Sequence, residues 1–184
     1  MFYTKEKLKK IGFKSIGDNV LISDKASFYS PQNIEIGDNV RIDDFCILSA
    51  SSNIKIGNYV HISCYTSLIG EGKIVLEDYT SISGRVSIYS SNDDYTGLRM
   101  TNPMVPKEYT GVRHGPVIIK KHSIIGCGCV VLPNTILKEG VSVGVLSLLN
   151  GEYEEFSVYS GIPAKKIKKR QKKMLKYEQA LRDN

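Results

Sequence analysis

The sequence predicts an all-β chain folded as a parallel β-helix, and two observations predict it. An aliphatic–glycine pair recurs every 20 residues, at Ile16-Gly17, Ile36-Gly37 and Ile56-Gly57. Within each unit a bulky aliphatic residue returns every six positions, as at Ile36 and Ile42. Six residues suit one short strand and one corner, so three such units close a triangular coil. A fixed period of this kind indicates a solenoid whose coils stack on their neighbours.

The aliphatic and aromatic residues that recur with the six-residue period form the predicted core. A single coil buries none of them, whereas a stack of coils buries them all along its axis. They are Ile16, Ile22, Phe28, Ile36, Ile42, Leu48, Ile56, Ile62, Leu68, Leu76, Ile82 and Ile88, and then Ile119, Ile125, Val131, Leu137, Val143 and Leu149.

The six-residue period is interrupted between Ile88 and Ile119. Residues 89–118 have the composition of a loop, with Pro103, Pro106 and Pro116 among Ser, Asn, Asp and Gly. A loop of this length inside a compact domain is uncommon and is usually functional, although a tolerated insertion at a corner would read the same way. We therefore predict one β-helix domain over residues 1–164, with an excursion at 89–118.

Both ends of the chain carry helix signals. Thr4 can cap a short amphipathic helix that closes the open first coil. Residues 165–184 hold nine Lys or Arg and two acidic residues, so the net charge of +6 lies in this tail. We predict a basic C-terminal helix there. The body is neutral, and the basic tail has no ladder of interleaved aromatic residues apart from Tyr177, so we expect no nucleic-acid partner.

Composition sets further bounds. The chain has 184 residues, 41% of them hydrophobic, which is typical of one globular domain. It has no apolar stretch of membrane-spanning length and no signal-peptide core at its start, so we expect a cytoplasmic protein without a membrane partner. The four cysteines lack the spacing of a metal site, and we expect no metal.

The hexads and three further tracts carry a resemblance to a known family. The tracts are Gly115-Pro116-Val117-Ile118-Ile119, Ile125-Gly126-Cys127-Gly128-Cys129 with the residues that follow it, and Ser160-Gly161-Ile162-Pro163-Ala164-Lys165. Together they resemble the left-handed β-helix, or hexapeptide-repeat, acyltransferases. The branch that the chain resembles includes sugar O-acetyltransferases and N-acyltransferases of nucleotide-linked amino sugars.

The resemblance implies a homotrimer with active sites between subunits and acyl-CoA as co-substrate. It implies that the last coils hold the pantetheine arm of CoA and that tail cations meet its phosphates. The residues implied are Gly126, Cys127, Val145, Asn150, Lys165 and Lys168. The chemistry agrees, because amides of pantetheine can pair with coil backbone and a diphosphate needs cations.

The chain departs from the O-acetyltransferases at the catalytic position. Those enzymes carry a histidine just after the strand that corresponds to residues 87–89, where this chain reads Ser90-Ser91-Asn92-Asp93-Asp94. A hydroxyl needs such a base to attack a thioester, whereas an amine held in line can attack when uncharged. A carboxylate can orient the amine and accept its proton. This favours N-acylation with Asp93 as the first candidate, and Asp94, Glu139 and Ser83 as others.

The resulting hypothesis is an acyl-CoA-dependent N-acyltransferase. Its acceptor would be a nucleotide-linked deoxy amino sugar used for surface polysaccharide such as lipopolysaccharide, and its donor acetyl-CoA or a longer acyl-CoA. The alternative is a sugar O-acetyltransferase with His114 or His122 as the general base. A non-enzymatic β-solenoid scaffold is the third class, but the outward positions lack a regular ladder.

Overall fold

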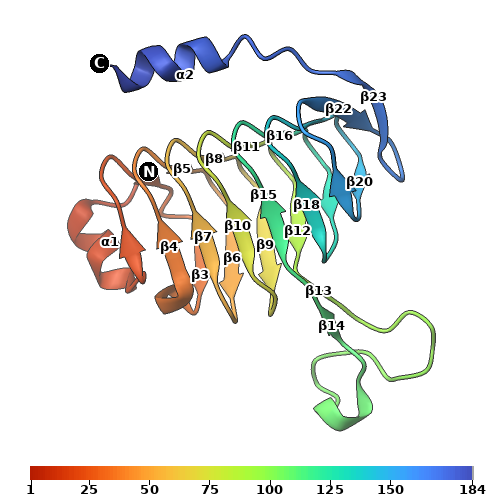
Figure 1. Ribbon diagram of the computed structural model, residues 1–184. Helices are drawn as coiled ribbons and strands as arrows, with labels where there is room; N and C mark the ends of the chain where they lie inside the picture. Colours follow the sequence, from red (N-terminus) through yellow and green to blue (C-terminus); the bar gives the residue numbers. More distant parts are fainter. Residues whose placement is uncertain (184) are drawn as a thin grey trace.

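The computed structural model describes residues 1–183. The chain forms a triangular solenoid whose faces are three parallel β-sheets, with an arm extending from one corner (Figure 1). The first sheet has seven strands, which corresponds to seven coils. The prediction of a parallel β-solenoid with a protruding loop and a C-terminal helix is confirmed.

The strands are short and repeat in the same order from coil to coil. The first sheet contains β1 (Ser15–Ile16), β4 (Ile34–Ile36), β7 (Ile54–Ile56), β10 (Ile74–Leu76), β15 (Val117–Ile119), β18 (Thr135–Leu137) and β21 (Glu152–Tyr153). The second contains β2 (Leu21–Ile22), β5 (Arg41–Ile42), β8 (His61–Ile62), β11 (Ser81–Ile82), β16 (Ile124–Ile125), β19 (Ser142–Val143), β22 (Ser157–Ser160) and β23 (Lys165–Lys169). The third contains β3 (Ser27–Tyr29), β6 (Ile47–Ala50), β9 (Ser67–Gly70), β12 (Ser87–Tyr89), β17 (Val130–Val131) and β20 (Leu148–Leu149).

The core consists of the aliphatic columns that the hexads predict. Ile42 and Ile62 are register partners in one sheet, and both are fully buried. Alternate residues of a strand point to opposite faces, so one inward residue per strand fills the prism while its neighbours face outward. Ile16 and Phe28, which we placed in the core, are only half-buried. They lie in the first coil, which has a neighbouring coil on one side only.

Helix α1 (Lys5–Ile11) closes the first coil as predicted. The Thr4 hydroxyl accepts a hydrogen bond from the Lys7 amide at 3.4 Å, and Leu8 is the buried residue of the helix. Two 3-10 turns, Pro31–Asn33 and Lys107–Tyr109, complete the short helical elements outside the tail.

The excursion is slightly shorter than predicted. Tyr89 belongs to β12, and Val117 and Ile118 belong to β15, because each continues the ladder of its sheet. The chain leaves the solenoid after β12 and returns at β15. Two strands of its own, β13 (Ser91–Asn92) and β14 (Arg113–His114), pair antiparallel at the base of the arm.

The tail differs from the prediction of a helix over 165–184. Its first part is β23, which pairs antiparallel with β22 at the open edge of the last coil. An edge strand offers unpaired backbone groups, and that pairing satisfies them where a helix would not. Only Leu175–Arg182 form a helix, α2, which runs back over the coils (Figure 1). Asn184, the last residue of the predicted helix, lies outside the described residues.

Candidate active site

Close packing fixes the base of the excursion on the solenoid. A Cβ added to Gly72 would lie 2.5 Å from the carbonyl oxygen of Gly115, and a Cβ on Gly115 would collide with the side chain of Asn134. The backbone amide of Gly115 donates to the carbonyl of Ser90 at 3.0 Å. Glycine is therefore required at both positions, and the start of the arm is held rigidly against the corner between β12 and β15.

The arm and the neighbouring coils enclose a hollow of about 550 Å³. Asp93 is exposed and lines it, and His114 lines it as well. The remaining wall combines coil residues such as Ile69 and Glu71 with arm residues such as Val105. The structure thus brings the first carboxylate candidate and one of the histidine candidates into the same pocket.

Asp94 has a different environment from Asp93. It is buried, and its carboxylate accepts hydrogen bonds from the Thr96 amide at 2.9 Å and the Thr96 hydroxyl at 2.6 Å. Its other oxygen accepts the Arg99 amide at 2.8 Å. These bonds, led by that of the Thr96 side chain, hold the pKa of Asp94 below its usual range. All three donors belong to the arm, so Asp94 shapes the loop.

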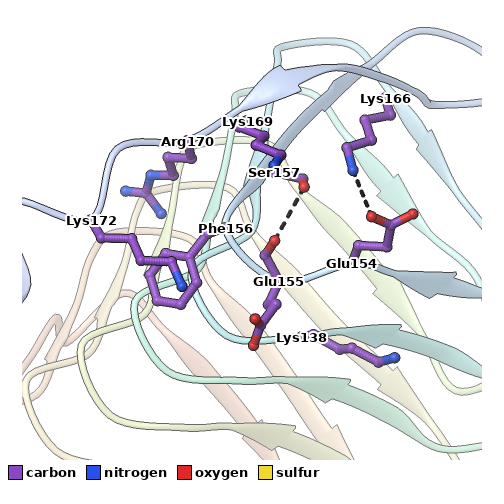
Figure 2. Close-up of a pocket in the computed structure, with 9 residues that line it drawn as sticks. All are labelled: Lys138, Glu154, Glu155, Phe156, Ser157, Lys166, Lys169, Arg170 and Lys172. Carbon is purple, nitrogen blue, oxygen red and sulfur yellow. Dashed lines mark hydrogen bonds and ion pairs between the residues drawn. The ribbon is translucent and has the colours of Figure 1, made fainter.

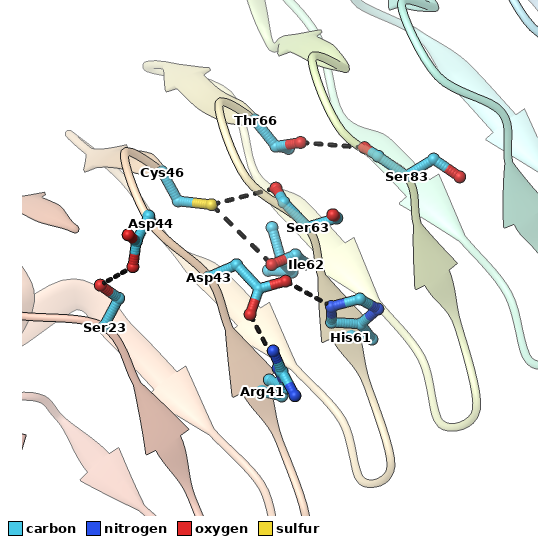
Figure 3. A network of polar contacts seen from close by, with 10 residues as sticks. All are labelled: Ser23, Arg41, Asp43, Asp44, Cys46, His61, Ile62, Ser63, Thr66 and Ser83. Atoms are coloured by element: carbon cyan, nitrogen blue, oxygen red, sulfur yellow. Dashed lines mark hydrogen bonds and ion pairs between the residues drawn. The ribbon is translucent and has the colours of Figure 1, made fainter. Parts of the chain in front are cut away.

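Ser83 stands on a second corner, between β11 and β12. Its carbonyl accepts the Thr66 hydroxyl at 3.0 Å, and its own hydroxyl points away from the neighbouring residues (Figure 3). The corners of the next coils stack on this one. Gly128 donates its amide to the Gly84 carbonyl at 3.1 Å, and Leu146 donates to the Cys127 carbonyl at 2.9 Å.

Three of the residues that we expected to contact CoA lie in this corner column. Gly126 and Cys127 occupy one coil, and Val145 occupies the next. Cys127 and Val145 are exposed, and a Cβ on Gly126 would lie 2.7 Å from the Val145 amide nitrogen. The column therefore presents a tightly stacked, accessible edge that runs from Ser83 toward the last coil.

Lower coils of the same corner are occupied by internal contacts. Asp43 accepts hydrogen bonds from Arg41 at 2.7 Å and pairs with His61 at 2.8 Å (Figure 3). Burial raises the pKa of Asp43, but the bonds from His61 and Arg41 outweigh it and leave that pKa below its usual range. The Cys46 thiol bonds the Ser63 carbonyl, and burial raises the pKa of Cys46 to about 11. A thiol in this state is structural.

Glu139 and Asn150 lie apart from that column. Glu139 is on the third corner, between β18 and β19, where its carbonyl accepts the Phe156 amide at 2.8 Å. Asn150 is between β20 and β21, on the corner that also carries the excursion. Asp93, Ser83 and Glu139 thus stand on three different corners, and one prism does not bring them together.

The tail cations surround a separate hollow of about 480 Å³ near the last coil (Figure 2). Lys166 forms an ion pair with Glu154 at 2.5 Å, and the Lys172 ammonium lies 4.1 Å from the centroid of the Phe156 ring. Lys165 and Lys168 do not line this hollow. Both are exposed on β23, which leaves them accessible to an anion from outside.

His122 is a structural residue in this chain. Its imidazole is 9% exposed, stacks on Tyr79 with ring centroids 5.1 Å apart, and bonds Glu178 of α2 at 2.6 Å. One ring face and one nitrogen therefore contact protein groups, on the corner between β15 and β16 and away from the excursion's hollow. Of the two histidines that we considered as general bases, only His114 lines a pocket with a candidate carboxylate.

Sequence reasoning missed two residues of the excursion's hollow, Ser91 and Glu71. Ser91 bonds His114 across the antiparallel strands at 2.8 Å, and Glu71 lies on the neighbouring coil. The serine is 23 positions from the histidine, so only the pairing of β13 with β14 reveals the contact. Among residues 1–183 no group of three or more His, Cys, Asp or Glu could hold a metal ion. Neither helix of this part of the chain is long and apolar enough to cross a bilayer.

Comparison with known proteins decides the family. No family model matches the chain. The chain is 55% identical over 172 residues to the dTDP-4-amino-4,6-dideoxy-D-glucose acyltransferase of Escherichia coli. The matched region covers 93% of this chain and 90% of that protein. The chain belongs to the hexapeptide-repeat acyltransferases of dTDP-linked amino sugars.

Solved structures agree with this assignment. The N-acyltransferase AntD of Bacillus cereus, in complex with dTDP and 3-hydroxybutyryl-CoA, superposes with a TM-score of 0.96. It is 46% identical and covers 99% of this chain and 96% of its own. A variant of AntD in which a serine is replaced by cysteine, in complex with dTDP-4-amino-4,6-dideoxyglucose and coenzyme A, also has a TM-score of 0.96. It is 45% identical and covers 99% of this chain and 97% of its own. The prediction of an acyl-CoA-dependent acyltransferase acting on a nucleotide-linked amino sugar is confirmed.

Proposed function

We propose that this enzyme transfers an acyl group from acyl-CoA to the amino nitrogen of dTDP-4-amino-4,6-dideoxyglucose. The observation that carries the proposal is the identity of 55% to an acyltransferase of that sugar, spread over 93% of the chain. The chain also lacks the histidine that the sugar O-acetyltransferases carry just after the strand corresponding to β12, which sets it apart from enzymes with a hydroxyl acceptor. The donor is acetyl-CoA or a hydroxyacyl-CoA.

Asp93 is the carboxylate that we assign to the acceptor amine. It is exposed in the hollow beneath the arm, where a sugar can reach it, whereas Asp94 is committed to the loop. The uncharged amine attacks the thioester carbonyl carbon, the C–S bond breaks, and the proton shed by the nitrogen passes through Asp93 to the CoA thiolate. Ser83 would hydrogen-bond the sugar or the reacting groups from the other corner. Glu139 has no contact that supports a role.

The corner column is the path that we assign to CoA. Cys127 and Val145 are exposed and Gly126 is half-buried along the axis of the solenoid, and pantetheine amides can pair with backbone groups that the coils leave free. Lys165 and Lys168, exposed on β23, would meet the phosphates at the end of that path. Asn150 lies on another corner, so it would reach CoA only across a subunit boundary.

A homotrimer of parallel prisms would bring the separated corners together. Asp93 and Ser83 lie at opposite ends of the same sheet face within one chain. If the arm of one subunit lies against the Ser83 corner of the next, the carboxylate, the hydroxyl and the thioester meet in one cleft. We place the reaction in the cytoplasm and its product in the synthesis of surface polysaccharide, such as lipopolysaccharide.

The test is a product assay with paired acceptors. The purified protein is offered acetyl-CoA or 3-hydroxybutyryl-CoA with dTDP-4-amino-4,6-dideoxyglucose, and separately with the matching sugar that has a hydroxyl at that carbon. We expect mass spectrometry to show acylation of the amine alone, with kcat reduced about 100-fold or more in Asp93→Asn. Acylation of the hydroxyl sugar, or full activity of Asp93→Asn, would contradict the proposal.

A further inference from the structure

Three polar side chains meet at the base of the arm and have no assigned role. The pairing of β13 with β14 places Ser91 opposite His114. The Ser91 hydroxyl oxygen lies 2.8 Å from His114 Nδ1, and the Nε2 of the same ring lies 3.7 Å from the Glu71 carboxylate. The Ser91 oxygen also accepts the backbone amide of Glu71 at 2.7 Å. The result is a serine, an imidazole and a carboxylate in series.

The hydrogen bonds give this series a direction. Because the Ser91 oxygen already accepts the amide hydrogen of Glu71, its own hydrogen is free to point at Nδ1. When the Ser91 oxygen accepts a proton, it can therefore pass its own hydroxyl proton on to Nδ1 of the imidazole. The carboxylate of Glu71 lies on the far side of the ring, beside Nε2. Imidazole is also the side chain whose ordinary titration lies nearest neutrality.

The series opens into the hollow that holds Asp93. Ser91, His114 and Glu71 all line that space, and the charged groups around the ring are Glu71, Asp93 and Lys107. The imidazole is about 39% exposed, so it can exchange protons with solvent at the outer side. The hydroxyl therefore faces the pocket, and the ring connects it to bulk water.

We propose that Ser91, His114 and Glu71 form a proton-acceptor relay that deprotonates the amino sugar before it attacks. The inference rests on the proposed function of the same pocket. An amino sugar at neutral pH is largely an ammonium ion, which has no lone pair for attack. One of its protons moves to the Ser91 oxygen while the hydroxyl proton moves to His114 Nδ1, and the imidazolium releases it to solvent.

The proton count supports two separate acceptors. The ammonium nitrogen carries three hydrogens, and the amide nitrogen of the product carries one. The relay removes the first proton, so that a C–N bond can form at the thioester carbonyl. The second proton leaves the nitrogen after attack and passes to Asp93, which gives it to the CoA thiolate when the C–S bond breaks. Asp93 and the relay thus act on different protons of one nitrogen.

The test compares His114→Asn with Ser91→Ala under saturating substrates. Each should lower kcat about 100-fold and change KM less than about threefold. In the wild type kcat should rise with pH on an acid limb, because only the neutral imidazole accepts a proton, and His114→Asn should lose that limb. A change in folding alone would not remove a limb of the pH profile. If both variants keep kcat within about twofold of the wild type, the relay is refuted.

Chemical rescue separates a proton acceptor from a merely structural histidine. Imidazole added to His114→Ala should restore kcat at least about tenfold, because the free base can occupy the space beside Ser91. The double variant with Ser91→Ala should show no rescue, and equal rescue there would contradict the ordered path. An acyl group found on Ser91 by mass spectrometry would overturn the relay in favour of a nucleophile. If the wild type itself fails to acylate the dTDP-amino sugar, the proposed function fails; if it is active and the variants are too, only the relay fails.

Discussion

His122 allows a direct test between a structural and a catalytic role, because the sequence alone suggested it as a general base. In the structure it connects the solenoid to α2 through Glu178 and stacks on Tyr79. We predict that His122→Asn loosens α2 and leaves catalysis intact. Asparagine is the suitable replacement because the backbone at this position has φ of 59°, a left-handed conformation that asparagine tolerates better than alanine.

The expected loss follows from the two contacts that the ring makes. A stacked aromatic pair contributes about 0.5–1.5 kcal/mol, and a hydrogen bond to a charged group about 1.5–3 kcal/mol. Glu178 keeps a partner in Arg182, so its charge is not left unpaired in the variant. The loss of stabilisation of α2 should therefore be less than the sum of the two contacts, about 1–3 kcal/mol. The open state of α2 should then be populated about five- to 150-fold more.

Hydrogen exchange measures that population directly. The amides of α2 should exchange faster in His122→Asn by the factor given above, while those of β11 should not change. Glu178→Gln should reproduce part of the effect, and the double variant should show less than the sum, because the two residues share one contact. An unchanged α2 together with a fall in kcat of about 100-fold would refute the structural role and make His122 a proton-transfer group.

Three other predictions address the arm, the corner column and the tail. Asp94→Asn puts an N–H group opposite a backbone donor, so limited proteolysis should cut the arm faster while the melting temperature of the solenoid hardly changes; an uncut arm would contradict its role. Gly126→Ala should lower the free energy of unfolding by about 1–3 kcal/mol in denaturant melts, since its Cβ would lie 2.7 Å from backbone of the next coil. Gly84→Ala, with no contact closer than 3.2 Å, should cost less, and the reverse order would refute the packing argument. Replacing Lys165 and Lys168 by Ala should raise KM for acyl-CoA more than KM for the sugar nucleotide, and equal changes in steady-state kinetics would remove them from the CoA path.

The sequence predicts the solenoid because its physics is local and repeated. Each hexad places one aliphatic residue inward, so the positions of Ile42, Ile62 and Ile82 follow from counting alone. The prediction of a helix over the whole tail was wrong for a physical reason. Whether Lys165–Lys169 form a helix or a strand depends on the unpaired edge of β22, and that edge is a property of the folded stack.

The candidate site could be predicted only in outline. A sequence shows that Asp93 and Asp94 are neighbours, but not that one carboxylate faces the hollow while the other accepts three hydrogen bonds within the arm. Nor does it show Ser91 against His114, since that contact depends on two strands pairing across the excursion. The proposed site thus depends on the irregular segment, where the six-residue rule no longer applies.

The geometry of the prism gives a reason for the division of the proposed reactive groups between the arm and the corner column. A corner column repeats one local conformation from coil to coil, so it suits a long ligand such as the pantetheine arm, which needs similar backbone contacts along its length. Proton transfer needs different groups at one point, and a repeat does not supply them. In the site that we propose these groups lie on the arm, whose base is fixed by the close contact of Gly72 with Gly115. A subunit that supplies its arm to one neighbour and its Ser83 corner to the other would give each cleft both kinds of surface.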